Sequence, residues 1–495
     1  MRRPLFALSL AGVLALASFS VVLASGVALT GIGARATALG GAYRGLSNDW
    51  SGMYWNPAGL AQIKGLHFGG SFEIVAPKGK YLANPAIGAL RTTEVDNEPQ
   101  TFYLPAAGFV YGMDKLAVGI SVFAPFGLGS KWNLLETSGY NPLYPDIDVE
   151  DDLKVIDIHP SFAYQVTEKL SVGLGASIVM NSIEIRQPVF TPNPLKLTPL
   201  NPLLTQLGLL AKPFDHLLTE QKLDGDGWGF GGNIGLQYKV TECLTLGLAG
   251  RYYLDQPLEG KVSMLTYTAK PADQQLAALQ SQLNALLAGG QIDQDTYAKV
   301  MGVYSGATIN PQTQQPAAAP VETEVTADLP LPLEVGMGLT YTGINNLVVS
   351  ADVSFTQWSA WDKIKVNKKA DGKEFGELVE EWKDGVRISA GLEYSLSALK
   401  IRSFFYTEPA ATPDHTLSPT IPDINRRYVG GLGLGYCLGF GTVHASLEKM
   451  FIGDRTVATW AEVKDATGMV TSYDNMAGTY KLDAMNFMLG IDIKL

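Results

Sequence analysis

The stretch LSVGLGASIVM, residues 170–180, decides the fold class of this chain. Apolar side chains occupy the even positions from Val172 to Met180, whereas serine or glycine occupies positions 171, 173, 175 and 177. Successive side chains of a strand point to opposite faces, so this alternation predicts one apolar face and one small or polar face. The same pattern returns at residues 386–394, 432–438 and 485–495. We therefore expect an all-β protein.

The composition suits a protein whose outer surface is largely apolar. The chain has 495 residues, of which 46% are apolar and 17% charged, and its formal net charge is −11. Low charge content is unusual for a soluble surface, and the negative balance argues against a nucleic-acid partner. After the first two dozen residues, no run is long and apolar enough for a membrane-spanning helix. Cys243 and Cys437 could form a disulfide or remain two free thiols.

The first residues resemble an export signal. Arg2 and Arg3 precede an apolar run over residues 5–23, and small residues follow around Ala24. This order predicts a signal peptide at residues 1–24, although an uncleaved helical anchor is the alternative. The mature protein is expected in the cell envelope.

The connections between strands distinguish a membrane barrel from a soluble sandwich. We expect about 14 strands, an even number as single-chain barrels require. Tight turns at 112–114, 167–169, 241–243, 343–345, 397–398 and 439–441 alternate with long links. Short periplasmic turns and long external loops are typical of transmembrane antiparallel β-barrels. Residues 65–495 are thus predicted to form such a barrel, with external loops at 77–100, 127–153, 188–227, 263–321, 367–379, 409–425 and 457–478.

A segment rich in small residues precedes the first predicted strand. Residues 33–61 read GARATALGGAYRGLSNDWSGMYWNPAGLA and do not look like a domain that folds alone. We expect residues 25–64 to form a partly helical plug inside the barrel lumen. Asn56, Pro57 and Ala58 would form the turn that leads from the plug to the first strand, because Asn-Pro favours turns. A simple exit turn without a gating role is the alternative.

Several short motifs follow one another along the chain. The motifs are Arg35, Gly40-Gly41-Ala42, Asn48-Asp49 and Asn56–Leu60, then Ala124–Gly127, Trp358–Trp361 with Lys365, Lys383–Arg387, and Ile421–Asp423 with Arg426. Their ordered set resembles the FadL family of outer-membrane transporters for long-chain fatty acids and hydrocarbons. The motifs span essentially the mature chain. One departure is the final residue, Leu495, where such barrels commonly end in an aromatic side chain.

The resemblance implies passive uptake of hydrophobic compounds, most of all long-chain fatty acids, across the outer membrane of a Gram-negative-type cell. It also implies lateral release through a kinked third strand. Pro125 and Gly127 would interrupt that strand, since proline cannot donate to a sheet ladder; alternatively, Pro125 only ends the strand. A hydrocarbon channel and a non-transporting adhesin are the other functions considered. Outer-membrane lipid and lipopolysaccharide are the expected surroundings of what we take to be a monomer.

Two long loops contain leucines at helical spacing. Leu203, Leu207 and Phe214 belong to one loop, and Leu279 and Leu283 belong to the next. Paired amphipathic helices could leave an apolar groove that captures a lipid, or could seal against each other as a cap. Large exposed apolar patches usually bind something, which favours the groove.

A fatty-acid carboxylate in a low-dielectric lumen needs a cation. Arg186 and Lys365, near the outer ends of their predicted strands, are the expected head-group ligands, and Arg251 is a further candidate. Alternatively, lumenal arginines hold the plug. No histidine, serine or metal-ligand pattern points to an enzyme, a metal or a cofactor.

Overall fold

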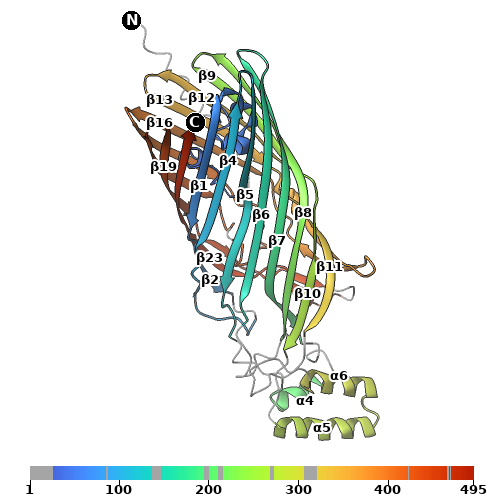
Figure 1. Cartoon of the computed structure of the whole chain (residues 1–495). Coiled ribbons are helices and arrows are strands. Elements are labelled where there is room, and N and C mark those ends of the chain that lie inside the picture. Colours follow the sequence, from blue (N-terminus) through green and yellow to red (C-terminus); the bar gives the residue numbers. More distant parts are fainter. Residues whose placement is uncertain are drawn as a thin grey trace.

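A computed structural model describes residues 26–29, 31–84, 87–136, 147–193, 195, 200–209, 216–267, 273–305, 320–421, 423–464, 466, 468 and 470–495. Within these residues, fourteen long antiparallel strands form a closed barrel (Figure 1), which confirms the predicted fold class. Pairing of the first strand with the last, for example Phe68 with Ile493, closes the wall.

Ten of these strands are continuous and four are interrupted in the middle. The continuous strands are β1 (Gly65–Val75), β4 (Phe102–Gly112), β5 (Leu116–Trp132), β6 (Val149–Gln165), β7 (Leu170–Pro192), β8 (His216–Thr241), β17 (Leu399–Glu408), β18 (Arg427–Cys437), β19 (Gly441–Ile452) and β24 (Met485–Lys494). The interrupted strands are β9 (Leu244–Tyr253) with β10 (Gln256–Tyr267), β11 (Val321–Leu329) with β12 (Glu334–Ile344), β13 (Leu347–Thr356) with β14 (Lys363–Lys368), and β15 (Glu374–Val379) with β16 (Gly385–Leu396).

Shorter elements lie inside the barrel or at the end with the long loops. Inside are α2 (Ala34–Thr37), α3 (Gly52–Trp55) and η2 (Pro57–Gln62), whereas η5 (Trp358–Ala360) lies in the interruption between β13 and β14. One small sheet contains β2 (Lys78–Ala83), β3 (Val95–Asp96), β20 (Arg455–Val457) and β23 (Gly478–Asp483), and a hairpin contains β21 (Glu462–Lys464) and β22 (Val470–Tyr473). The helices α4 (Asn201–Gln206), α5 (Asp273–Ala288) and α6 (Gln294–Ser305) lie beyond the barrel, at the end opposite the C-terminus (Figure 1). No helix of the described part is long and apolar enough to cross a membrane.

The two faces of the wall differ as the alternation predicts. Leu174, Phe230 and Leu432 are more than half exposed on the outer face, whereas Ser177 and Asn233 are buried on the inner face. An apolar outer surface with a polar interior is the pattern of a barrel that meets lipid.

Several strands extend further than the sequence predicts. The expected loops 127–153 and 188–227 are partly strand, because β5 continues to Trp132, β6 begins at Val149, β7 continues to Pro192 and β8 begins at His216. Several outward residues of these extensions are charged, such as Lys222, which forms a 2.9 Å ion pair with Glu184. A strand without an apolar face gives no period-two hydrophobic signal, so the sequence pattern did not show these ends.

Residues 31–63, called the lumenal segment below, lie inside the barrel where a plug is expected (Figure 1). Most of this segment is buried, and Trp50, Met53 and Leu60 form one apolar cluster with wall residues. The Trp55 indole donates to the carbonyl of Ile32 over 2.9 Å, which ties the two ends of the segment together. Cys243 and Cys437 are both free thiols, so the disulfide alternative is excluded.

Candidate ligand cavity and wall opening

The barrel wall opens between β4 and β5. β4 pairs with β1 along its whole length, from Phe102 to Gly112, but it pairs with β5 only between Ala107 and Gly112. Beyond Val122, β6 is the one long strand of the wall that pairs with β5 in the described chain, and the register between them shifts between Phe123 and Phe126. Five residues at the start of β4, 102–106, therefore face an edge that β5 has left.

A proline marks each side of this opening. Pro125 of β5, which the sequence predicts as a break, lies within the shifted register. Pro105 of β4 lies in the part that β5 has left, and sequence analysis did not select it. Proline has no N–H for a ladder bond, so both edges are poorly suited to pair with each other. Its position inside a predicted strand could have identified Pro105 from the sequence.

Residues 27–29 form some of the backbone hydrogen bonds that β5 does not form with β4. The amide of Leu29 donates to the carbonyl of Pro125 over 3.0 Å, and the amide of Gly127 donates to the carbonyl of Val27 over 3.1 Å. Ala28 and Phe126 form an antiparallel bridge. Gly127, predicted as a gate residue, thus contacts the N-terminal end of the described chain.

A cavity of about 560 Å³ lies at the opening. Phe123 and Val155, both buried, line it on the inner side. Tyr103, Val122 and Ile156, which are exposed on the outer face, line it as well. The cavity is mainly apolar, and it connects the interior with the outer surface of the wall.

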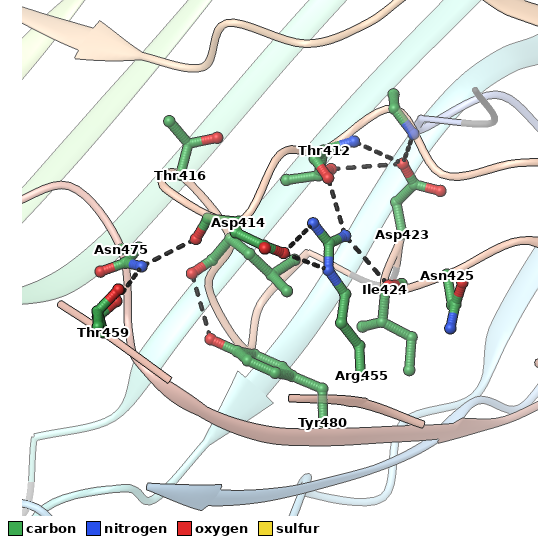
Figure 2. A network of polar contacts seen from close by, with 12 residues as sticks. Thr412, Asp414, Thr416, Asp423, Ile424, Asn425, Arg455, Thr459, Asn475 and Tyr480 are labelled. Carbon is green, nitrogen blue, oxygen red and sulfur yellow. Dashed lines mark hydrogen bonds and ion pairs between the residues drawn. The ribbon is translucent and has the colours of Figure 1, made fainter. Parts of the chain in front are cut away.

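The loop 409–425 covers the cavity at the long-loop end with Pro419, Ile421 and Ile424. Figure 2 shows the polar network that holds this loop. Arg455 donates to Asp414 Oδ1 over 2.6 and 2.8 Å and to the carbonyl of Ile424 over 3.1 Å. Burial raises the pKa of Tyr480, so its hydroxyl stays protonated and donates to the carbonyl of Leu417.

Inward basic side chains bind the lumenal segment. Arg251, predicted as a substrate ligand, donates to the carbonyl of Tyr54, lies 3.7 Å from the centre of that ring and pairs with Glu334 at 3.6 Å. Arg387 donates to the carbonyl of Gly40 over 2.9 Å. The alternative reading of the lumenal arginines, that they hold the segment, fits these contacts.

Arg186 and Lys365 do not face the interior, contrary to expectation. Arg186 lies on the same strand face as the outward Met180 and bonds to Glu220 over 2.6 Å. Lys365 is 63% exposed, next to the inward-facing Ile364, and pairs with Glu374 at 3.3 Å. Strand faces alternate, so the residue number alone places both cations outside. The structure does not join them into one head-group site.

The loop leucines close against each other. Leu279 and Leu283 are fully buried in a cluster that also contains Leu204 and Val300, with Leu203 and Leu207 packed at its edge. This arrangement fits the cap better than the predicted groove. Phe214 lies outside the described residues.

Asn56, Pro57 and Ala58 contact β7 and β8 rather than the opening. Asn56 is fully buried, and its side-chain amide donates to the carbonyls of Arg44 and Leu236, over 2.9 and 3.0 Å. A Cβ on Gly173 would lie 2.3 Å from Pro57 and Ala58 backbone atoms. The three residues therefore lie against β7 and β8, at the side of the lumen formed by these strands.

The closed antiparallel wall and its lipid-facing surface define an integral β-barrel protein of the outer membrane. A family model described as "Outer membrane protein transport protein (OMPP1/FadL/TodX)" matches residues 14–492, so the chain belongs to this family.

Individual relatives are distant. A "47 kDa outer membrane protein" of Pasteurella multocida (strain Pm70) is 28% identical over 222 residues, which cover 44% of this chain and 42% of the relative. "Outer membrane protein P1" of Haemophilus influenzae (strain ATCC 51907 / DSM 11121 / KW20 / Rd) is 25% identical, covering 65% of this chain and 60% of the relative. The chain thus spans less than two thirds of these two relatives. A "Long-chain fatty acid transport protein" of Salmonella typhi is 23% identical, covering 78% of this chain and 79% of the relative.

Solved structures share the fold. A Pseudomonas aeruginosa FadL homologue has a TM-score of 0.70 at 17% identity, and covers 95% of this chain and 100% of its own. The P. putida toluene transporter TodX has a TM-score of 0.62 at 17% identity, with 96% and 99% covered.

Proposed function

We propose that this protein lets hydrophobic compounds diffuse across the outer membrane and releases them sideways, through the opening between β4 and β5, into the bilayer. One observation carries the proposal: a single apolar cavity is lined both by the buried Phe123 and by the outward-facing Tyr103. Apolar compounds favour such a path because it spares them contact with water. The long loops would face the outside of the cell, among lipopolysaccharide.

Long-chain fatty acids are the first substrate class, as the name of the Salmonella typhi relative suggests. Uncharged hydrocarbons are the second, in line with the name of the toluene transporter. The apolar lining of the cavity serves either class, and the outward position of Arg186 and Lys365 removes the two cations expected to favour a carboxylate.

A bulky side chain placed in the opening tests whether compounds leave the barrel there. Ala124 lines the cavity beside Pro125, and Ala124→Trp should fill the path. Uptake of radiolabelled fatty acid and of toluene into proteoliposomes should fall towards the protein-free level. Ala351→Trp on the outer face of β13 is the matched control, because β13 pairs with strands on both sides there. Normal uptake by a folded Ala124→Trp barrel would exclude this exit.

A further inference from the structure

Buried polar side chains on two neighbouring strands, β1 and β24, interrupt the apolar lining of the cavity. Glu73 of β1 is 2% exposed and Asn486 of β24 is 5% exposed, and both line the cavity. Glu73 pairs in register with Leu104, within the part of β4 that β5 has left. One strand, β4, therefore separates Glu73 from the wall opening, and two strands, β1 and β4, separate Asn486 from it.

The pair offers hydrogen-bond acceptors. The amide nitrogen of Asn486 donates to Glu448 Oε1 over 3.1 Å, which fixes the orientation of this amide, and its Oδ1 is buried without a hydrogen-bond partner. Glu73 has Asn486 as its polar neighbour and Glu448, another acid, as its charged neighbour. Leaving a buried acceptor without a donor costs the folded protein free energy. A ligand that donates a hydrogen bond would satisfy it.

The backbone keeps the Glu73 carboxyl in this place. A Cβ on Gly31 would lie 1.7 Å from Glu73 Oε2, so only glycine leaves room for the carboxyl against the lumenal segment. The position of the carboxyl is thus set from two sides, by this glycine and by Asn486.

The basic residues that line the cavity already have acidic partners. Lys80 and Lys481 share Glu94, at 3.1 and 2.7 Å. Lys154 pairs with Asp152 at 2.6 Å, and Arg427 pairs with Glu408. To pair with one of these cations, a ligand carboxylate would have to displace its acid, and beside Glu73 and Asn486 Oδ1 it would meet acceptors.

We propose that Glu73 and Asn486 select the polar group of the compound that passes. The cavity takes hydrophobic compounds with an uncharged hydrogen-bond donor, such as the hydroxyl of a long-chain alcohol or the protonated carboxyl of a fatty acid, and rejects the bare carboxylate. This inference rests on the proposed function, and it names the substrate form that the opening accepts. Leaving an acceptor unpaired is an effective way to discriminate between close analogues.

The experiment compares an alkane, a primary alcohol and a carboxylate of equal chain length, in proteoliposomes that contain the full-length protein. For the wild type, we expect uptake of alcohol above that of carboxylate. In Asn486→Leu and in Glu73→Leu, the ratio of alcohol to alkane uptake should fall roughly three- to tenfold, the effect of one lost net hydrogen bond.

Asn181→Leu is the matched control. Asn181 is equally buried on the inner face of β7, bonds to Gln256 over 3.2 Å and does not line the cavity. Heat-modifiable migration confirms that each barrel is folded. An unchanged alcohol-to-alkane ratio in both cavity variants would overturn the inference while transport stands. A wild-type barrel that admits none of the three compounds would overturn the proposed function, and the inference with it.

Discussion

Replacement of Glu393 by glutamine should loosen the lumenal segment. Glu393 is 4% exposed on β16 and accepts hydrogen bonds from Arg35 Nε and Nη2, both at 3.0 Å, and from Arg402 Nε at 2.6 Å. Glu393→Gln would leave two guanidinium groups side by side without their acid. Removal of one partner from a buried ion pair costs about 3–5 kcal/mol.

The loss should affect the lumenal segment more than the wall. Arg35 belongs to α2, whereas Arg402 and Glu393 are held in paired strands. A cost of about 3 kcal/mol raises the population of the detached segment by about two orders of magnitude. Hydrogen exchange by mass spectrometry measures this opening directly, since exchange reports the free energy of local opening. We expect amides 34–42 to exchange about 100-fold faster, with little change in β16 and β17.

An exposed ion pair provides the control. Glu259 pairs with Lys369 on the outside of the wall, and both side chains are close to half exposed or more. Glu259→Gln should change stability by about 0–1 kcal/mol, as surface ion pairs do. If Glu393→Gln left the exchange of the segment at the level of this control, or accelerated exchange in the wall equally, the idea that Glu393 fastens the segment would be wrong.

Two further predictions concern charge and packing. Joint replacement of Arg186 and Lys365 by alanine should leave fatty-acid uptake within a factor of about two, since Lys365 loses a surface ion pair and Arg186 loses its pairs with Glu220 and Asp148 on the outer strand face; a strong loss of uptake would restore them as head-group ligands. Gly433→Val should destabilise the folded barrel by about 1–3 kcal/mol, because its Cβ would lie 2.4 Å from Ala38. Urea unfolding of this variant beside Gly376→Val, whose Cβ meets nothing within 4 Å, tests the contact, and equal midpoints would refute it.

The alternation of the strands could be read from the sequence because lipid and lumen impose opposite demands on neighbouring residues. The same rule was sufficient to place Arg186: it has the even parity of Val172 and Met180, which face outwards, and the expectation of a lumenal arginine ignored that parity. The interruptions of the strands near Asp255 and Asp362 gave no such signal, since they depend on how the wall bends around its contents.

The sequence analysis predicted one edge of the wall opening and missed the other. Pro125 predicted a break in the third long strand, and Pro105 carried the same signal on the opposite edge without being used. The contact of residues 27–29 with Pro125 and Gly127 could not be predicted, because it joins segments about a hundred residues apart through backbone groups that every residue has. Sequence composition does not distinguish such a partner from any other extended stretch.

Glycines on the inner face of the wall lie against the lumenal segment. A Cβ on Gly336 would lie 2.3 Å from the Arg44 side chain, and one on Gly235 would lie 2.0 Å from Asn56. Glycine weakens a strand, so its repeated use on one face needs a compensating contact. That contact is the lumenal segment, whose arginine and asparagine bond back to the same strands, as Arg44 does to Glu334 and Asn56 to Leu236. At these glycine positions, atoms of the lumenal segment occupy the space that a wall side chain would otherwise fill. A barrel without the segment would therefore lose packing and hydrogen bonds along several strands, rather than simply become an open pore.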